Sequence, residues 1–148
     1  MYNALIAVYI IQIIVMIVCI GIIHKGNSGN RKNMLWLVGT AIITAAGYTA
    51  SILMPTGLQD LAVFFEGVYF IGTDWLVIAL MFFVSDYTSI YKPVKLPKLI
   101  FAGVAAVDSV SLVINTFTRH MFTLERAALS WTDYWQIRYE PLHYFHMY

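Results

Sequence analysis

Three acidic side chains fall inside long apolar segments of this sequence, where ionisable groups are rare. Glu66 lies about one turn into the third apolar segment, Asp74 lies eight residues further on, and Asp108 lies near the centre of the fourth. Even the lower estimates put the cost of a central Asp in a membrane-spanning helix at roughly 2.5–3.5 kcal/mol. We therefore expect these acids to face the interior of a helix bundle.

A polar face is predicted on the third segment. Helical spacing places Glu66, Tyr69 and Thr73 on one stripe, with Asp74 beside them. We expect this face to look into the bundle, as a ligand site or an acid-relay site shared with neighbouring segments. The alternative is that each acid is neutral and hydrogen-bonded to Ser, Thr or Tyr on a neighbouring helix. For Glu66 and Asp74 the sequence leaves both interpretations open.

For Asp108 the structural interpretation is favoured. Ser109, Ser111 and Asn115 follow it closely in sequence and offer hydrogen-bonding groups. An acid that is satisfied in this way holds helices together and needs no ligand.

Metal binding and catalysis are not predicted. His143 and His146 are spaced to meet on a helix, but neither Cys partners nor a third fixed ligand accompany them. The sequence contains no Gly-rich phosphate loop and no nucleophile elbow. Asp74 and Asp108 resemble an aspartyl pair only in residue type, without a supporting flanking pattern. We expect no cofactor, and no enzyme activity within residues 1–148.

Four apolar segments must position these residues. The chain of 148 residues is 60% hydrophobic and 11% charged, whereas ordinary soluble domains carry roughly 25% charged residues. A membrane span needs about 20 mostly apolar residues, and four stretches approach or meet this, at 4–23, 34–53, 61–83 and 99–117. The sequence therefore predicts an all-α, polytopic helix bundle in the cell membrane. A net charge of +1 gives no indication of nucleic-acid binding.

Lys and Arg residues predict the orientation of the bundle. They occur in the connections 24–33 and 84–98, but not in the connection 54–60 or the N-terminal tail. Short cytoplasmic loops are enriched in Lys and Arg, so we expect the N-terminus outside and both basic connections inside. The charged, aromatic segment 118–140 then lies outside, and we expect a short surface helix followed by an extended stretch.

Small residues and the end of the chain give two further expectations. Ala41, Ala45, Gly47 and Ser51 on the second segment, and the pair 102 and 106 on the fourth, form small-x-x-x-small patterns that predict burial of both segments. From residue 141 the chain becomes apolar and aromatic again. We expect a fifth span to begin over 141–148 and the sequence to continue beyond it.

Six short stretches carry a resemblance to a known family. They are Phe65-Glu66-Gly67, Asp74-Trp75-Leu76, Phe83-Val84-Ser85-Asp86-Tyr87-Thr88, Ile114-Asn115-Thr116, Arg119-His120-Met121-Phe122 and Tyr144-Phe145-His146-Met147-Tyr148. Together they resemble the N-terminal seven-helix transmembrane sensor region of bacterial histidine kinases and diguanylate cyclases. That family has an acid and a Trp in its third span, and an Asn followed by a His at the outer end of its fourth. Glu66, Trp75, Asn115 and His120 match these places.

The resemblance implies a signal-input region whose seventh span leads to a cytoplasmic signalling domain in the same chain. Its other implied partners are the lipid bilayer and a small-molecule or lipid ligand, and a homodimer is compatible with it. The candidate ligand-binding residues are Glu66, Tyr69, Asp74, Trp75, Asp108, Asn115 and His120. Only four spans and the edge of a fifth are present, so the sequence does not predict which type of signalling domain the region serves.

Two alternatives from other classes remain open. In a small ion- or proton-coupled transporter, or a subunit of one, Asp74 and Asp108 would couple protons or cations to a substrate. In a membrane scaffold without a ligand, the small-residue faces would bind partner helices.

Overall fold

The four apolar segments form four long helices in the computed structural model, which describes residues 2–26, 29–88, 95–129 and 132–146. The helices are α1 (Tyr2–Lys25), α2 (Arg31–Leu53), α3 (Gln59–Thr88) and α4 (Lys95–Thr118). All four are long and apolar enough to cross a membrane, and each predicted span lies within one of them.

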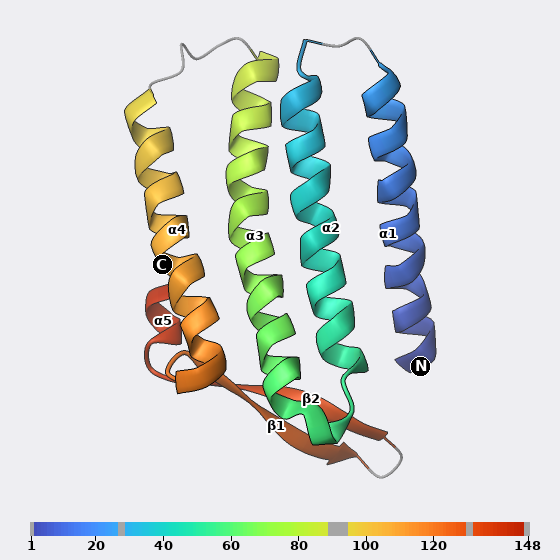
Figure 1. Cartoon of the computed structure of the whole chain (residues 1–148), viewed down its shortest axis with the longest axis vertical. Helices are drawn as coiled ribbons and strands as arrows, with labels where there is room; N and C mark the ends of the chain where they lie inside the picture. Colours follow the sequence, from blue (N-terminus) through green and yellow to red (C-terminus); the bar gives the residue numbers. More distant parts are fainter. Residues whose placement is uncertain (1, 27–28, 89–94, 130–131, 147–148) are drawn as a thin grey trace.

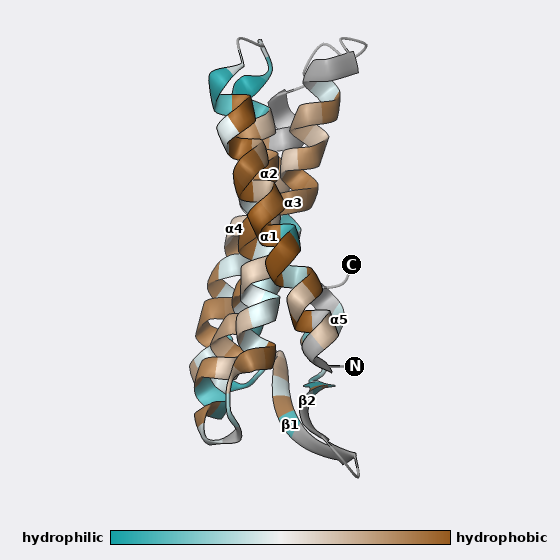
Figure 2. Cartoon of the chain, turned by 90° about the vertical axis from the view of Figure 1, so that its right-hand side faces the viewer, coloured by the Kyte–Doolittle hydropathy of each residue, from teal (hydrophilic) through white to brown (hydrophobic). Residues whose placement is uncertain are grey.

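Successive helices run in opposite directions and stand side by side in the order of the chain (Figure 1). The α1–α2 and α3–α4 connections therefore share one end of the bundle. At the other end, a short 3-10 helix, η1 (Thr56–Leu58), joins α2 to α3. Figure 2 shows hydrophobic residues along the middle of the helices and hydrophilic residues gathered toward the ends.

Helices α2 and α3 make a close contact at two glycines. A Cβ atom added at Gly47 would lie 2.7 Å from the backbone nitrogen of Tyr69. One added at Gly72 would lie 2.6 Å from Thr44 Oγ1 and 2.8 Å from the Thr44 nitrogen. Only a residue without a side chain fits at such a crossing. Gly47 is buried, which confirms the predicted burial of small residues on the second segment. The close contact at Gly72 was not predicted.

Helix α4 lies at the outside of the bundle, which corrects the prediction that the fourth segment is buried. The residues that it buries include Ala105, Leu112 and Asn115, which share one helical face. Ala106, half of the expected packing pair, is exposed, and Val107 is 73% exposed. The small pair failed as a signal because another stripe of the helix packs against α3.

The segment after α4 forms a β-hairpin, which corrects the expected surface helix and adds a two-stranded sheet to the predicted bundle of helices. Strands β1 (Phe122–Leu129) and β2 (Thr132–Tyr139) pair antiparallel, with Phe122 opposite Tyr139. Phe122 and Leu124 are buried, and Glu125 is exposed. On β2, exposed positions 136 and 138 alternate with partly buried positions 135 and 137. This period of two is the pattern of a strand, not of a helix.

The hairpin closes the end of the bundle where α2 meets α3. Gln59 Nε2 donates a 2.6 Å hydrogen bond to the Leu124 carbonyl, and Trp135 Nε1 donates a 3.1 Å bond to the Met54 carbonyl. A core cluster joins the hairpin to α3 and α4, formed by Ala62, Val63, Leu112, Met121, Phe122 and Leu124. The short helix α5 (His143–His146) follows, within the expected start of a fifth span; residues 147–148 lie outside the described residues.

An exposed ion pair lies across the hairpin. Arg138 Nη1 is 2.9 Å from Glu125 Oε1, and Glu140 lies near the same guanidinium. The hydrogen bond that Arg138 donates to Glu125, together with the charges of both carboxylates, raises the pKa of Arg138 above its usual value. Because the pair is exposed, it contributes little to stability.

Candidate functional site

Asn115 builds the turn that connects α4 to the hairpin. It is fully buried, its Nδ2 donates to the Phe122 carbonyl at 3.0 Å, and its Oδ1 accepts from the Met121 nitrogen at 2.8 Å. Arg119 takes a left-handed conformation with φ of 54°, and its nitrogen donates to the Asn115 carbonyl. Asn115, a predicted ligand residue, thus positions the turn through backbone contacts.

This turn brings His120 back over the last turns of α4. His120 Nε2 lies 3.0 Å from Ser111 Oγ, and its Nδ1 is hydrogen-bonded to Thr118 Oγ1. Ser111 also lies within hydrogen-bonding distance of Met121 Sδ, at 3.3 Å. A neutral imidazole offers one donor and one acceptor, so it can donate to one hydroxyl and accept from the other. Both ring nitrogens are therefore directed at polar groups of α4.

A second polar contact joins the middle of α3 to the middle of α4. The carboxyl groups of Asp74 and Asp108 lie close enough to interact directly. One residue further along each helix, Trp75 Nε1 of α3 donates a 3.0 Å hydrogen bond to Ser109 Oγ of α4. Two adjacent carboxyl groups can share a hydrogen bond when one of them carries a proton. A pair that holds a single proton keeps one negative charge between the helices.

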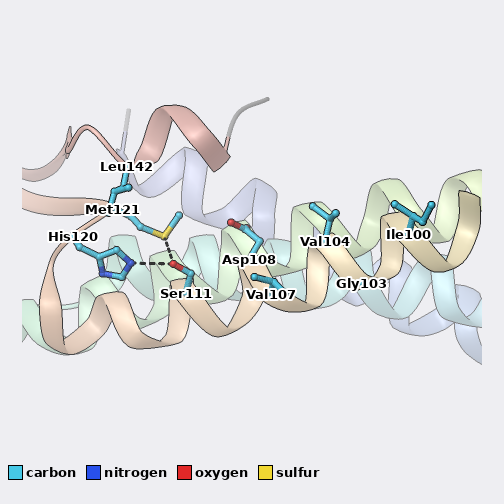
Figure 3. A pocket seen from close by; sticks show the side chains of 9 residues that line it. All are labelled: Ile100, Gly103, Val104, Val107, Asp108, Ser111, His120, Met121 and Leu142. Carbon is cyan, nitrogen blue, oxygen red and sulfur yellow. Dashed lines mark hydrogen bonds between the residues drawn. The ribbon is translucent and has the colours of Figure 1, made fainter.

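Asp108 and His120 line the same open pocket, which has a volume of about 720 Å³ (Figure 3). Its polar side chains, Asp108, Ser111 and His120, lie toward the hairpin end, where Met121 and Leu142 also border it. The remaining lining residues continue along α4 and are Ile100, Gly103, Val104 and Val107. The pocket is therefore polar at one end and apolar at the other.

Glu66 and Tyr69 belong to a different contact, between α3 and α2. Glu66 is 3% exposed, and its Oε2 lies 2.6 Å from Ser51 Oγ. The Tyr69 ring packs on Tyr48 of α2, with the ring centroids 5.3 Å apart. The eight residues from Glu66 to Asp74 turn the helix face by about 80°. Because α3 stands between α2 and α4, that rotation divides the predicted polar face between two neighbours.

Two features of the site were not singled out in the sequence. In the sequence, Ser111 is only a near neighbour of Asp108, and its contact with His120 depends on the left-handed turn at Arg119. That turn carries no glycine to signal it. An ion pair between Arg119 and Asp60, whose side chains are 24% and 90% exposed, ties the turn to the start of α3.

Comparisons with protein-family models, with curated proteins and with solved structures give no match for this chain. The resemblance to the seven-helix sensor region therefore stays a prediction from the sequence, and function must be inferred from the site.

Proposed function

We propose that residues 1–148 form the first part of a membrane-embedded signal-input region, which senses a small molecule or lipid. It passes the signal to a cytoplasmic signalling domain in the same protein. The observation that carries this proposal is the pocket along α4. Asp108 and Ser111 come from the helix, whereas His120 comes from the turn that leads into the hairpin. An occupant of the polar end therefore contacts both elements at once.

The proposed mechanism is a ligand-biased change in packing between α3 and α4. Asp108 lies beside Asp74 of α3 and also lines the pocket. A ligand group that engages Asp108 competes with Asp74 for it, and so weakens one polar contact between the two helices. A ligand shifts such an equilibrium only by its difference in affinity for the two packings.

The proposed orientation places the N-terminus and the hairpin outside the cell. Lys25, Arg31 and Lys32 lie at the bundle end opposite the hairpin, together with the start of α4 at Lys95 (Figure 1). The enrichment of Lys and Arg in cytoplasmic loops supports assigning this end to the cytoplasm. The polar end of the α4 pocket would then lie toward the outer surface of the cell membrane.

The first experiment is to read the coding sequence downstream of codon 148. Three further spans followed by a kinase or cyclase domain are expected, and a stop codon shortly after codon 148 would remove the proposal. The second is to measure the output of that domain in full-length protein carrying Asp108→Asn or His120→Ala. Both variants should change the output, whereas Glu125→Gln on the exposed hairpin face makes the same charge change as Asp108→Asn and should not.

The Glu66→Gln variant tests the predicted ligand-binding residues that lie against α2 instead of in the α4 pocket. Glu66 lies against α2 and not in the α4 pocket, so we expect its amide variant to leave the output unchanged. If Glu66→Gln alters the output and His120→Ala does not, the signal enters at the α2–α3 contact instead.

A proton-coupled transporter is the second candidate, and the carboxyl pair between Asp74 and Asp108 favours it. Paired acids near the middle of membrane helices serve proton pathways in many carriers. Proton flux through the full-length protein in liposomes, abolished by Asp74→Asn, would support this candidate. Liposomes that stay as proton-tight as protein-free ones would exclude it.

A further inference from the structure

We propose that the α4 pocket binds an amphiphile with a primary amine head group and an unbranched aliphatic tail. This inference rests on the proposed function and names the class of ligand for the same site. It follows from the shape of the pocket, from the groups at its polar end, and from the order in which polar and apolar residues line it.

The apolar part of the pocket has the form expected for a chain lying along α4. A Cβ atom added at Gly103 would meet nothing within 4 Å, so this position leaves open space in the wall. Ile100 and Val104, which border the space, are 57% and 63% exposed. Residues 100 to 108 cover a helix length of roughly 12 Å. An extended tail aligned with the helix axis would cover these side chains.

The polar part favours an amine over other head groups. An ammonium group offers three hydrogen-bond donors and no acceptor. Asp108 and Ser111 offer carboxyl and hydroxyl oxygens as acceptors, and the carboxyl pair with Asp74 keeps a negative charge when it holds one proton. Among the described residues that line the pocket there is no Lys or Arg. A carboxylate or phosphate head would therefore meet the Asp108 carboxyl with no Lys or Arg beside it.

The order of the lining matches an amphiphile that lies along α4 with its head group toward the hairpin. His120 and Ser111 lie at the hairpin end, and Val104 and Ile100 lie further along α4 (Figure 3). In the proposed orientation, a head group beside Asp108 lies near the middle of the membrane, and the tail along residues 100–107 extends toward the cytoplasmic end of α4. The volume of about 720 Å³ falls within the roughly 300–1,000 Å³ of small-molecule sites. An amphiphile already dissolved in the bilayer can enter sideways.

The test uses full-length protein in lipid nanodiscs and a dodecylamine probe with a photoreactive group near the end of its tail. Mass spectrometry then locates the labelled residues. We expect labelling concentrated on residues 100–107, and much weaker labelling by the matching dodecanol and dodecanoate probes. Asp108→Asn should weaken competition by unlabelled dodecylamine about 10- to 100-fold, the effect of losing one hydrogen bond to a charged group. Glu125→Gln is the control with the same change of charge.

The Gly103→Leu variant tests the tail site with a substitution that should leave the fold intact. The added side chain points into open space, and Leu favours a helix more than Gly does, so the helix should be preserved while the tail site is filled. We expect this variant to lose labelling on 100–107. Equal labelling by all three probes, or labelling that Gly103→Leu leaves intact, would overturn the proposal.

The same variants separate this proposal from the function on which it rests. If the amine probe binds as expected and Gly103→Leu leaves the output unchanged, the ligand class stands and the sensor function fails. If Gly103→Leu alters the output and no amine binds, the ligand class is wrong. Another occupant, such as a further helix packed on α4, then fills the pocket.

Discussion

Replacing Asn115 with Ala should release the base of the hairpin from α4. The variant removes the hydrogen bond that Nδ2 donates to the Phe122 carbonyl, at 3.0 Å, and the one that Oδ1 accepts from the Met121 nitrogen, at 2.8 Å. The longer contact from the Phe122 nitrogen, at 3.4 Å, is lost as well. Met121 and Phe122 are 4% and 0% exposed, so the backbone groups that lose their hydrogen-bond partner have little access to water.

The expected cost follows from the two shorter bonds. Each buried backbone group left without a partner costs about 1–3 kcal/mol, so we expect a loss of at least about 2 kcal/mol. That corresponds to about 30-fold more frequent local opening. Hydrogen exchange at the Met121 and Phe122 amides measures this opening directly. Gln136→Ala, which removes an exposed amide from β2, is the matched control and should leave both rates unchanged. Unchanged exchange in Asn115→Ala would refute the role assigned to this residue.

Three further predictions concern the helices. Gly72→Leu should lower the free energy of unfolding, measured by thermal unfolding in nanodiscs, by about 1–3 kcal/mol or more, because a Cβ there meets the neighbouring backbone. Gly21→Leu, where nothing lies within 4 Å, should cost little, and equal losses would contradict the close crossing. Glu66→Gln should unfold at nearly the same temperature as the unmodified protein, whereas Glu66→Ala should lose about 2 kcal/mol or more of unfolding free energy by leaving a cavity. Similar losses of stability in both variants would show that the charge of the acid matters. In a background without the native cysteine, an impermeant maleimide applied to intact cells should label Gln136→Cys and not Gly29→Cys, and the reverse pattern would invert the proposed orientation.

The helices of this protein could be predicted from the sequence, whereas the hairpin could not. A run of about 20 apolar residues has few structural options in lipid, so each predicted span falls within one helix of the structure. The segment 118–140 mixes charged and aromatic residues, and its alternation is visible only once Phe122 and Leu124 are known to face inward. The hairpin is then held by Gln59 and Trp135, whose partners lie 65 and 81 residues away in sequence.

The types of residue in the candidate site could be predicted from the sequence, but not which of these residues lie together. The cost of burying an acid in lipid identifies Glu66, Asp74 and Asp108, whatever their partners are. Which helix each acid faces depends on the order of the helices in space, and this order assigns Glu66 to α2 and Asp74 to α4. The meeting of His120 with Ser111 depends on the turn at Arg119, for which the sequence carries no glycine as a signal.

Whether the α4 pocket receives the signal is tested most directly by the output of the full-length protein in proteoliposomes titrated with dodecylamine. Two variants make the same Gly→Leu change in open space, Gly103→Leu inside the pocket and Gly21→Leu on α1. We predict that the output of Gly21→Leu follows the amine as the unmodified protein does, and that the output of Gly103→Leu no longer responds. An identical response of both variants would contradict the assignment of the pocket as the sensing site.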